Sequence, residues 1–527
     1  MSSSESFGKL RAFLWPIHKS ELRRFVPMFL IFFLICFNYS ILRTTKDALL
    51  VTAPGSGAEA IPFIKVWAIL PMALIFTLIF TRFSNYLTRE RVFYWMMSLF
   101  LAFFFLFTFV LYPFQEQLHP HELADKLEQM LPVGFKGLIA LIRNWTFTSF
   151  YVMSEMWSTM IMTVLFWGFA NEVTSVKDAK RFYILFGLGA NLATIFSGQI
   201  CTLLSTQKFI PSLPFGSNAW DQSVVLITSI VLLSGFVSIG LFRWLHVKGL
   251  GYPSSTSTGN PSEKEGPSDV KMGLRKNFAY LAKSKYLLSI AVIVLMYNIA
   301  MTLIEVVWKD QMKQLYPNPS EFNAYMGQVV TWIGIVATVG AFISGAVIRR
   351  FNWSTSALIP PVILFVTGIA FFCFLLFENT PTFSFIAAAL GTTPLVIGVF
   401  LGSTQNCFAR ASKYTLFDAT KELAFIPLDK ESKLKGKAAI DGIGSRLGKS
   451  GASIFHQGLL MLFGTVSLSA PYVALILLAA IVVWMVAVRA LGLRFTQLTH
   501  QQAENEASSS VNPALANAPI ASNNVVQ

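Results

Sequence analysis

The stretch FVPMFLIFFLICFNYSILRTTKDALLVT, residues 25–52, decides the class of fold. An apolar run of this length crosses a bilayer as a helix, since the hydrocarbon core takes about 20 residues. It is too long for the apolar core of a signal peptide, so we expect a retained membrane helix. Arg43, Lys46 and Asp47 lie in its second half, and charges at membrane depth are costly unless they face a polar pathway. This span therefore predicts a membrane protein with a polar interior.

The composition supports a polytopic membrane protein. The chain has 527 residues, of which 54% are hydrophobic and only 13% are charged. Its net charge of +14 fits contact with lipid headgroups, topology signals or an anionic substrate. Binding to nucleic acid is disfavoured, because the lysines are spread over loops between apolar runs. The 4 cysteines are isolated in apolar surroundings, which favours packing over a metal site or a disulfide framework.

Apolar runs of about 20 residues recur along the whole chain, and we expect twelve spans. They cover residues 25–52, 61–81, 92–112, 147–170, 183–204, 222–244, 286–308, 328–348, 357–377, 383–405, 439–463 and 470–493. Lys and Arg are enriched before the first and seventh spans and in alternate joints, whereas the joint GTVSLSA has none. Positive charge marks the cytoplasmic side, so both termini are expected there.

The longest central break is rich in Ser, Pro and Gly and divides the spans into two sets of six. The expected organisation is a cytoplasmic segment (1–24), a first half (25–245), a linker (246–285), a second half (286–493) and a disordered tail (494–527). A weak echo between FNYSILRTTKD and YNIAMTLIEVVWKD relates the halves. The predicted fold is an all-α, major-facilitator-like transporter with a site near the midplane. A short surface helix is expected in the loop at HPHELADKLEQML.

Three charged positions inside the spans are candidate site residues. Lys46 follows Arg43 by three residues on one face of the first span, and Asp47 can pair with Arg43. Glu155 has long apolar flanks, and Glu305 shares a polar face with Asn298. Ordinary helix ends, or structural ion pairs between helices, remain the alternative explanation for each of them.

Polar residues in the eleventh predicted span recur every four positions. Asp441, Ser445, Lys449 and Ser453 form this stripe, and His456 follows three residues later. Such a stripe has to face a cavity or a partner helix, because lipid would leave it unsatisfied. GKSG at 448–451 lacks the upstream glycine of a phosphate-binding loop, and the chain shows no catalytic or metal-binding motif. We therefore expect no enzyme activity, no cofactor and no metal.

The stretch from Leu401 to His456 is dense in lysine. Its first part, Lys413–Lys437, is interpreted as a cytoplasmic joint. The second-rank candidates for phosphate contact or gating are Arg43, Asn298, Lys421, Lys435, Lys437, Asp441 and Arg446.

Four blocks of sequence resemble the ATP/ADP translocase (nucleotide transporter) family of plastids and obligate intracellular bacteria. They are LRTTKDALLVTAPGSGAEAIPFIKVW (42–67), SEMWSTMIMTVLFWGFANEVTSVKDAKRFY (154–183), IEVVWK (304–309) and FDATKELAFIPLDKESKLKGKAAIDGIGSRLGKSGAS (417–453). The resemblance implies exchange of external ATP for internal ADP and leaves open whether phosphate travels with ADP. It also implies that Lys46, Glu155, Glu305 and Lys449 act on the substrate. A bacterial inner membrane is expected, because no transit peptide precedes the first span.

The deep charges suggest a mechanism without hydrolysis. Lys46 and Lys449, one from each half, would clamp the phosphates, and Glu155 and Glu305 would pair with these lysines when no nucleotide is bound. The site is expected between spans one, four, seven and eleven. The adenine would stack on an aromatic residue that the sequence does not identify. The alternative within the same family is a proton-coupled nucleotide importer, and the oligomeric state is not predicted.

Overall fold

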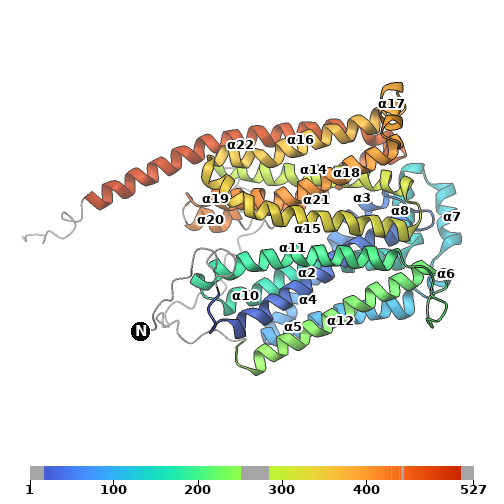
Figure 1. Cartoon of the computed structure of the whole chain (residues 1–527), viewed down its shortest axis with the longest axis horizontal. Coiled ribbons are helices and arrows are strands. Elements are labelled where there is room, and N and C mark those ends of the chain that lie inside the picture. Colours follow the sequence, from blue (N-terminus) through green and yellow to red (C-terminus); the bar gives the residue numbers. More distant parts are fainter. Residues whose placement is uncertain (1–16, 251–283, 429, 438–439, 441–443, 512–527) are drawn as a thin grey trace, which may run out of the picture.

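The computed structural model describes residues 17–250, 284–428, 430–437, 440 and 444–511. Every regular element in these ranges is helical, and the long helices run side by side along the longest axis of the molecule (Figure 1). We call α2 to α12 the N-terminal half and α14 to α22 the C-terminal half. The two halves lie next to each other along this axis (Figure 1).

The N-terminal half is built from long helices joined by short turns. The elements are α2 (Leu22–Val51), α3 (Ala60–Ile64), η1 (Lys65–Ile69), α4 (Leu70–Tyr86), α5 (Arg89–Leu106), η2 (Phe107–Leu111), α6 (Gln115–Leu118), α7 (His121–Met130), η3 (Val133–Phe135), α8 (Lys136–Arg143), α9 (Trp145–Met156), η4 (Trp157–Phe166), α10 (Trp167–Val173), α11 (Val176–Ser205) and α12 (Ala219–Val247). Helix α7 confirms the surface helix expected in this loop.

The C-terminal half follows the same plan with one broken helix. Its elements are α14 (Lys285–Leu315), α15 (Pro319–Arg350), α16 (Trp353–Phe377), α17 (Pro381–Ala389), α18 (Pro394–Ser412), η5 (Lys413–Phe417), α19 (Asp418–Ala424), α20 (Lys430–Lys437), α21 (Ser445–Phe463) and α22 (Val466–Val511).

Within the described part of the chain, nine helices are long and apolar enough to cross a membrane, or ten if a bent pair counts as one span. The predicted spans 147–170 and 439–463 are not among them, although helices occupy both regions. Glu155 and Lys449 lie in these two helices, together with other polar residues that lower their hydropathy. The all-α membrane fold is confirmed, and the count of twelve stays a prediction.

The observed helix ends differ from the predicted boundaries at the tenth span and at the tail. Gly391, with φ of 68°, turns the chain between α17 and α18, which are bent by 82°. Thr393 caps the new helix by accepting from the amide of Val396, and Pro394 occupies its first turn. The helix then continues to Ala424 and α20 covers Lys430–Lys437, so most of the predicted joint 413–437 is helical. Helix α22 likewise continues to Val511, into the tail predicted to be disordered.

Helices α11 and α15 bring the two halves into close contact where glycines remove side chains. A Cβ on Gly198 would lie 2.5 Å from the carbonyl oxygen of Gly327, and one on Gly334 would lie 2.9 Å from that of Asn191. The Asn323 amide adds a hydrogen bond of 2.8 Å to Ser205 between the same helices. Such close approach is typical of helix crossings in membranes, where packing replaces the hydrophobic effect.

We expect Gly198→Ala to destabilise the protein by about 1–3 kcal/mol, because the clash is with backbone that cannot move independently. Thermal unfolding in detergent measures the effect. Gly187→Ala is the matched control on the same helix, since a Cβ there meets nothing within 4 Å. Equal unfolding temperatures for the two variants would contradict the close crossing.

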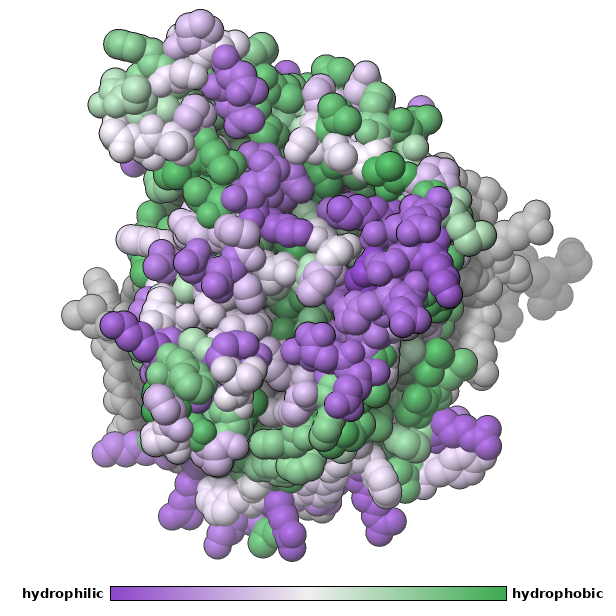
Figure 2. Space-filling model, turned by 90° about the vertical axis from the view of Figure 1, so that its right-hand side faces the viewer, coloured by the Kyte–Doolittle hydropathy of each residue, from purple (hydrophilic) through white to green (hydrophobic). Residues whose placement is uncertain are grey.

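The halves also meet at the end of the bundle that carries α3, α7 and α8 (Figure 1). Gln457 on α21 donates to the carbonyl of Pro62 at 2.9 Å and accepts from the Trp67 indole at 3.2 Å. Lys313 on α14 donates to the carbonyl of Ser56. We call this the closed end. Figure 2 looks onto it and shows hydrophilic residues in patches among hydrophobic ones.

His119, in the loop at the closed end, gives a pH-dependent contribution to stability. It is 8% exposed and contacts the hydroxyl of Thr146 at 2.6 Å. Burial, with a smaller effect from His121, lowers the pKa of His119 to about 4. The folded state therefore favours the neutral ring. This contribution is fully present above the ordinary pKa of 6.5 and is lost as the pH falls toward 4.

We expect His119→Gln to unfold with a flatter pH dependence than the parent between pH 6.5 and 4. Thermal unfolding in detergent across this range checks the prediction. Parallel curves for the two proteins would show that protonation of His119 is not linked to folding.

Candidate functional site

A cavity of about 450 Å³ lies between the two halves. Its volume is within the range of roughly 300–1,000 Å³ that is usual for small-molecule sites. It is lined from α2, η1, α9, η4, α14, α18, η5, α19 and α21, and so it extends toward the end of the bundle where α19 lies. The predicted site between spans one, four, seven and eleven corresponds to part of this lining.

The lining carries an excess of positive charge. Seven cationic side chains reach it, against three carboxylates, which is an excess of four positive charges among the lining residues. The cations are Arg43, Lys46, Lys65, Arg410, Lys413, Lys421 and Lys449, and the carboxylates are Glu155, Glu305 and Asp418. A cavity lined mostly by one sign of charge concentrates ligands of the opposite sign. The arrangement therefore favours an anion with several negative charges.

A chain of ion pairs crosses the cavity wall from one half to the other. Lys46 lies 3.2 Å from Glu155 and 3.0 Å from Asp47, and its ammonium group is 3.6 Å from the centre of the Tyr151 ring. Asp47 also pairs with Lys309 on α14 at 2.7 Å. Lys46, Asp47 and Lys309 are at most 2% exposed. Because uncompensated buried charges are very unfavourable, these partners hold each other in place.

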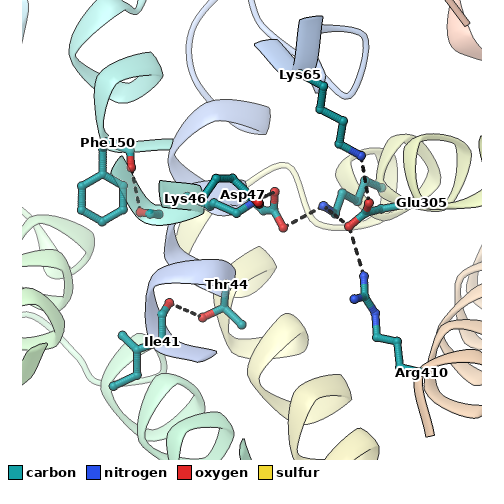
Figure 3. Close-up of polar contacts among 11 residues, drawn as sticks. Ile41, Thr44, Lys46, Asp47, Lys65, Phe150, Glu305 and Arg410 are labelled. Carbon is teal, nitrogen blue, oxygen red and sulfur yellow. Dashed lines mark hydrogen bonds and ion pairs between the residues drawn. The ribbon is translucent and has the colours of Figure 1, made fainter. Parts of the chain in front are cut away.

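Glu305 is the branch point of this chain of ion pairs. Its carboxylate pairs with Lys309 at 3.0 Å, with Lys65 at 3.2 Å and with Arg410 at 3.2 Å. Figure 3 shows Lys65 and Arg410 approaching it from opposite sides. Lys65 belongs to the N-terminal half and Arg410 to the C-terminal half, so Glu305 connects both.

The structure places the four first-rank candidates on one cavity. Lys46, Glu155, Glu305 and Lys449 all line it. In the described part of the chain, Lys449 has no carboxylate within ion-pair distance, although it lines the same cavity as the paired residues. The polar stripe of α21 is divided: Lys449 faces the cavity, whereas Ser453 and His456 are buried in the packing.

The second-rank candidates separate into two groups. Arg43, Asn298 and Lys421 line the cavity. Lys437 instead pairs with Glu422 at 2.5 Å, and Arg446 is exposed and does not contribute to the lining. The side chain of Lys435 and the whole of Asp441 lie outside the described residues.

Two predicted pairings are wrong in this conformation. Asp47 pairs with Lys46 and Lys309 rather than with Arg43, because Lys309 approaches it from the facing helix α14. Glu305 pairs with Lys65, Lys309 and Arg410 rather than with either clamp lysine, Lys46 or Lys449. The expected pairing of Lys46 with Glu155 is present.

Several functional candidates were missed from the sequence. Lys65 lies near a predicted helix start, and Arg410 lies beyond the predicted end of the tenth span. The signal that could have found Arg410 is Thr393-Pro394, a cap followed by proline, which starts a new helix at Pro394 that includes Arg410. Lys309 was not among the candidate residues, although it is fully buried in the structure.

Comparison with known families identifies the chain. Residues 1–495 match the model of the TLC ATP/ADP transporter family. The chain belongs to this family. The ADP,ATP carrier protein 1 of Chlamydia muridarum is 47% identical over 486 residues, which cover 92% of this chain and 90% of the relative. The chloroplastic ADP,ATP carrier protein 1 of Arabidopsis thaliana is 41% identical and covers 94% of this chain and 78% of its own length. This TLC transporter is thus a multi-pass membrane carrier and not an enzyme.

Solved structures support the fold of the TLC transporter. A bacterial homologue of the iron transporter ferroportin, in an inward-facing state, matches with a TM-score of 0.55 at 16% identity and covers 89% of this chain and 99% of its own. A bacterial metal transporter matches with a TM-score of 0.53 at 14% identity, covering 90% and 99%. At this identity the likeness concerns the fold alone, and it confirms the expected major-facilitator-like architecture.

Proposed function

We propose that this chain is an ATP:ADP antiporter of a bacterial inner membrane, with both termini in the cytoplasm, that imports ATP in exchange for ADP by alternating access. The observation that carries the proposal is the excess of four positive charges around the cavity, in a chain of the TLC ATP/ADP transporter family. Nucleoside di- and triphosphates bring about three to four negative charges at neutral pH, which matches this excess. Relatives named ADP,ATP carrier support the choice of nucleotide.

Within this function, Lys46 and Lys449 act as a clamp on the phosphates. They project into the cavity from opposite halves, so a phosphate chain held by both would draw the halves together. Lys46 is paired with Glu155 at 3.2 Å in this conformation, and phosphate would replace the carboxylate as its partner. Glu305 keeps the neighbouring cations compensated while the site is empty.

The base would occupy the aromatic part of the lining. Tyr297 and Phe417 stack with their ring centres 4.7 Å apart, and both belong to the cavity wall. Asn298 lies beside them on α14 and donates to the carbonyl of Val294 at 2.8 Å. Its side-chain oxygen remains an acceptor, which suits the amino group of adenine.

Uptake of labelled ATP into liposomes that contain the purified protein tests the proposal. We expect preloading with ADP to stimulate uptake at least about tenfold over empty liposomes, since exchange requires a nucleotide on both sides. Preloading with AMP is the matched comparison. Uptake that does not depend on internal ADP and that an uncoupler abolishes would instead establish the proton-coupled importer.

A further inference from the structure

Two cations of the cavity differ from all the others in having no anionic partner. Arg43 on α2 and Lys449 on α21 line the cavity, and within the described residues neither has a carboxylate at ion-pair distance. The other five lining cations are each paired with Glu155, Glu305, Asp418 or Glu422. The free pair comes from opposite halves of the molecule.

Lys46 is the opposite case. It is 2% exposed and lies between Asp47 and Glu155, with the Tyr151 ring against its ammonium group. A phosphate can reach it only after these partners have moved. Docking of a polyphosphate on Lys46 would require it to displace the carboxylates that already pair with this lysine. Docking on the two cations that have no carboxylate partner is therefore the more favourable first step.

We propose that the phosphates dock first on Arg43 and Lys449 in this conformation, and that Lys46 joins the phosphates only when the transporter changes state. This inference rests on the proposed function and assigns an order to its steps. The planar guanidinium of Arg43 can bind two phosphate oxygens at once, whereas the ammonium of Lys449 acts as a mobile point charge. The ligand of this pair is the diphosphate unit that ADP and ATP share.

The order predicts that binding and exchange separate in the variants. We expect Arg43→Gln and Lys449→Gln each to weaken the binding of ADP, and of pyrophosphate as a probe without base, at least about tenfold, as the loss of a charge-assisted contact implies. Arg43→Lys keeps the positive charge but loses the planar group that can bind two phosphate oxygens at once, and it should weaken binding severalfold. Lys46→Gln should weaken the binding of ADP less than Arg43→Gln does, and it should reduce the rate of exchange more.

Binding is measured on the purified full chain by titration with labelled ADP and by thermal stabilisation with pyrophosphate. Arg89→Gln is the control, because Arg89 is a 74% exposed side chain that pairs with Glu172 away from the cavity. Wild-type affinity in both Arg43→Gln and Arg43→Lys would overturn the inference, as would a greater loss of affinity in Lys46→Gln than in Arg43→Gln. If Arg43→Gln fails to fold, Arg43→Lys alone decides. Absence of ATP:ADP exchange by the parent protein in liposomes would refute the function, which is a separate result.

Discussion

Glu305→Gln is expected to reduce ATP:ADP exchange about a hundredfold or more. The substitution leaves Lys65, Lys309 and Arg410 without their shared carboxylate, which is 17% exposed. Removing one partner of a buried ion pair costs about 3–5 kcal/mol, and here three cations lose the same partner. Such an energy corresponds to a factor of about 10² to several times 10³ in an equilibrium between conformations. Exchange in ADP-preloaded liposomes measures the effect.

Glu422→Gln is the matched control for this prediction. Glu422 also pairs with lysines, but its side chain is 48% exposed, so solvent compensates for the loss. We expect its exchange to stay within about twofold of the parent. Thermal unfolding of both variants separates a defect in transport from a defect in folding. A Glu305→Gln protein that exchanges at the parental rate would show that the branch point is dispensable.

In the proposed mechanism, the ion pairs couple the binding of the ligand to the change of conformation. Asp47–Lys309 and Lys65–Glu305 connect the two halves near the closed end. Opening that end separates the halves, and these pairs have to part. Once the halves separate, the two surfaces that these ion pairs connected carry more cations than carboxylates. A polyphosphate between the halves offers replacement charge, so a loaded carrier should change state more readily than an empty one.

The sequence was sufficient for the class of fold and for four of the charges that line the cavity. Residues 25–52 predicted a membrane helix, and α2 spans Leu22–Val51. Lys46, Glu155, Glu305 and Lys449 were singled out because charge at membrane depth is costly, and all four line one cavity. The cost of burying charge depends on depth along a helix, which hydropathy reports well.

Pairing and helix ends could not be read from the sequence. The sequence offers several possible cationic partners for each carboxylate. Asp47 pairs with Lys309 because α2 and α14 pack with these two side chains toward each other. Arg410 was placed outside the membrane because the tenth span was assumed to be continuous, whereas Gly391 turns the chain and shifts the helix. A break of a few residues moves every following side chain along the bundle axis by about 1.5 Å per residue.

Lys46→Gln is expected to reduce exchange to about one hundredth of the parental rate or less. The variant loses a residue of the proposed clamp and leaves Glu155 and Asp47 with less compensation. These two effects have different consequences, because only the second depends on the carboxylates. Exchange of labelled ATP in ADP-preloaded liposomes measures the loss, and retention of full uptake would exclude Lys46 from the clamp.

The double variant Lys46→Gln with Glu155→Gln separates the two effects. Neutralising Glu155 removes the uncompensated carboxylate, so a purely structural role for Lys46 predicts substantial recovery of exchange in the double variant. Neutralising Glu155 does not restore the positive charge that Lys46 would offer to the phosphates. The clamp hypothesis therefore predicts no recovery of exchange. The thermal stability of the double variant should rise above that of Lys46→Gln in either case, because the charge imbalance is relieved. Recovered stability with lost exchange would assign Lys46 to the substrate, whereas joint recovery would assign it to the packing between α2 and α9.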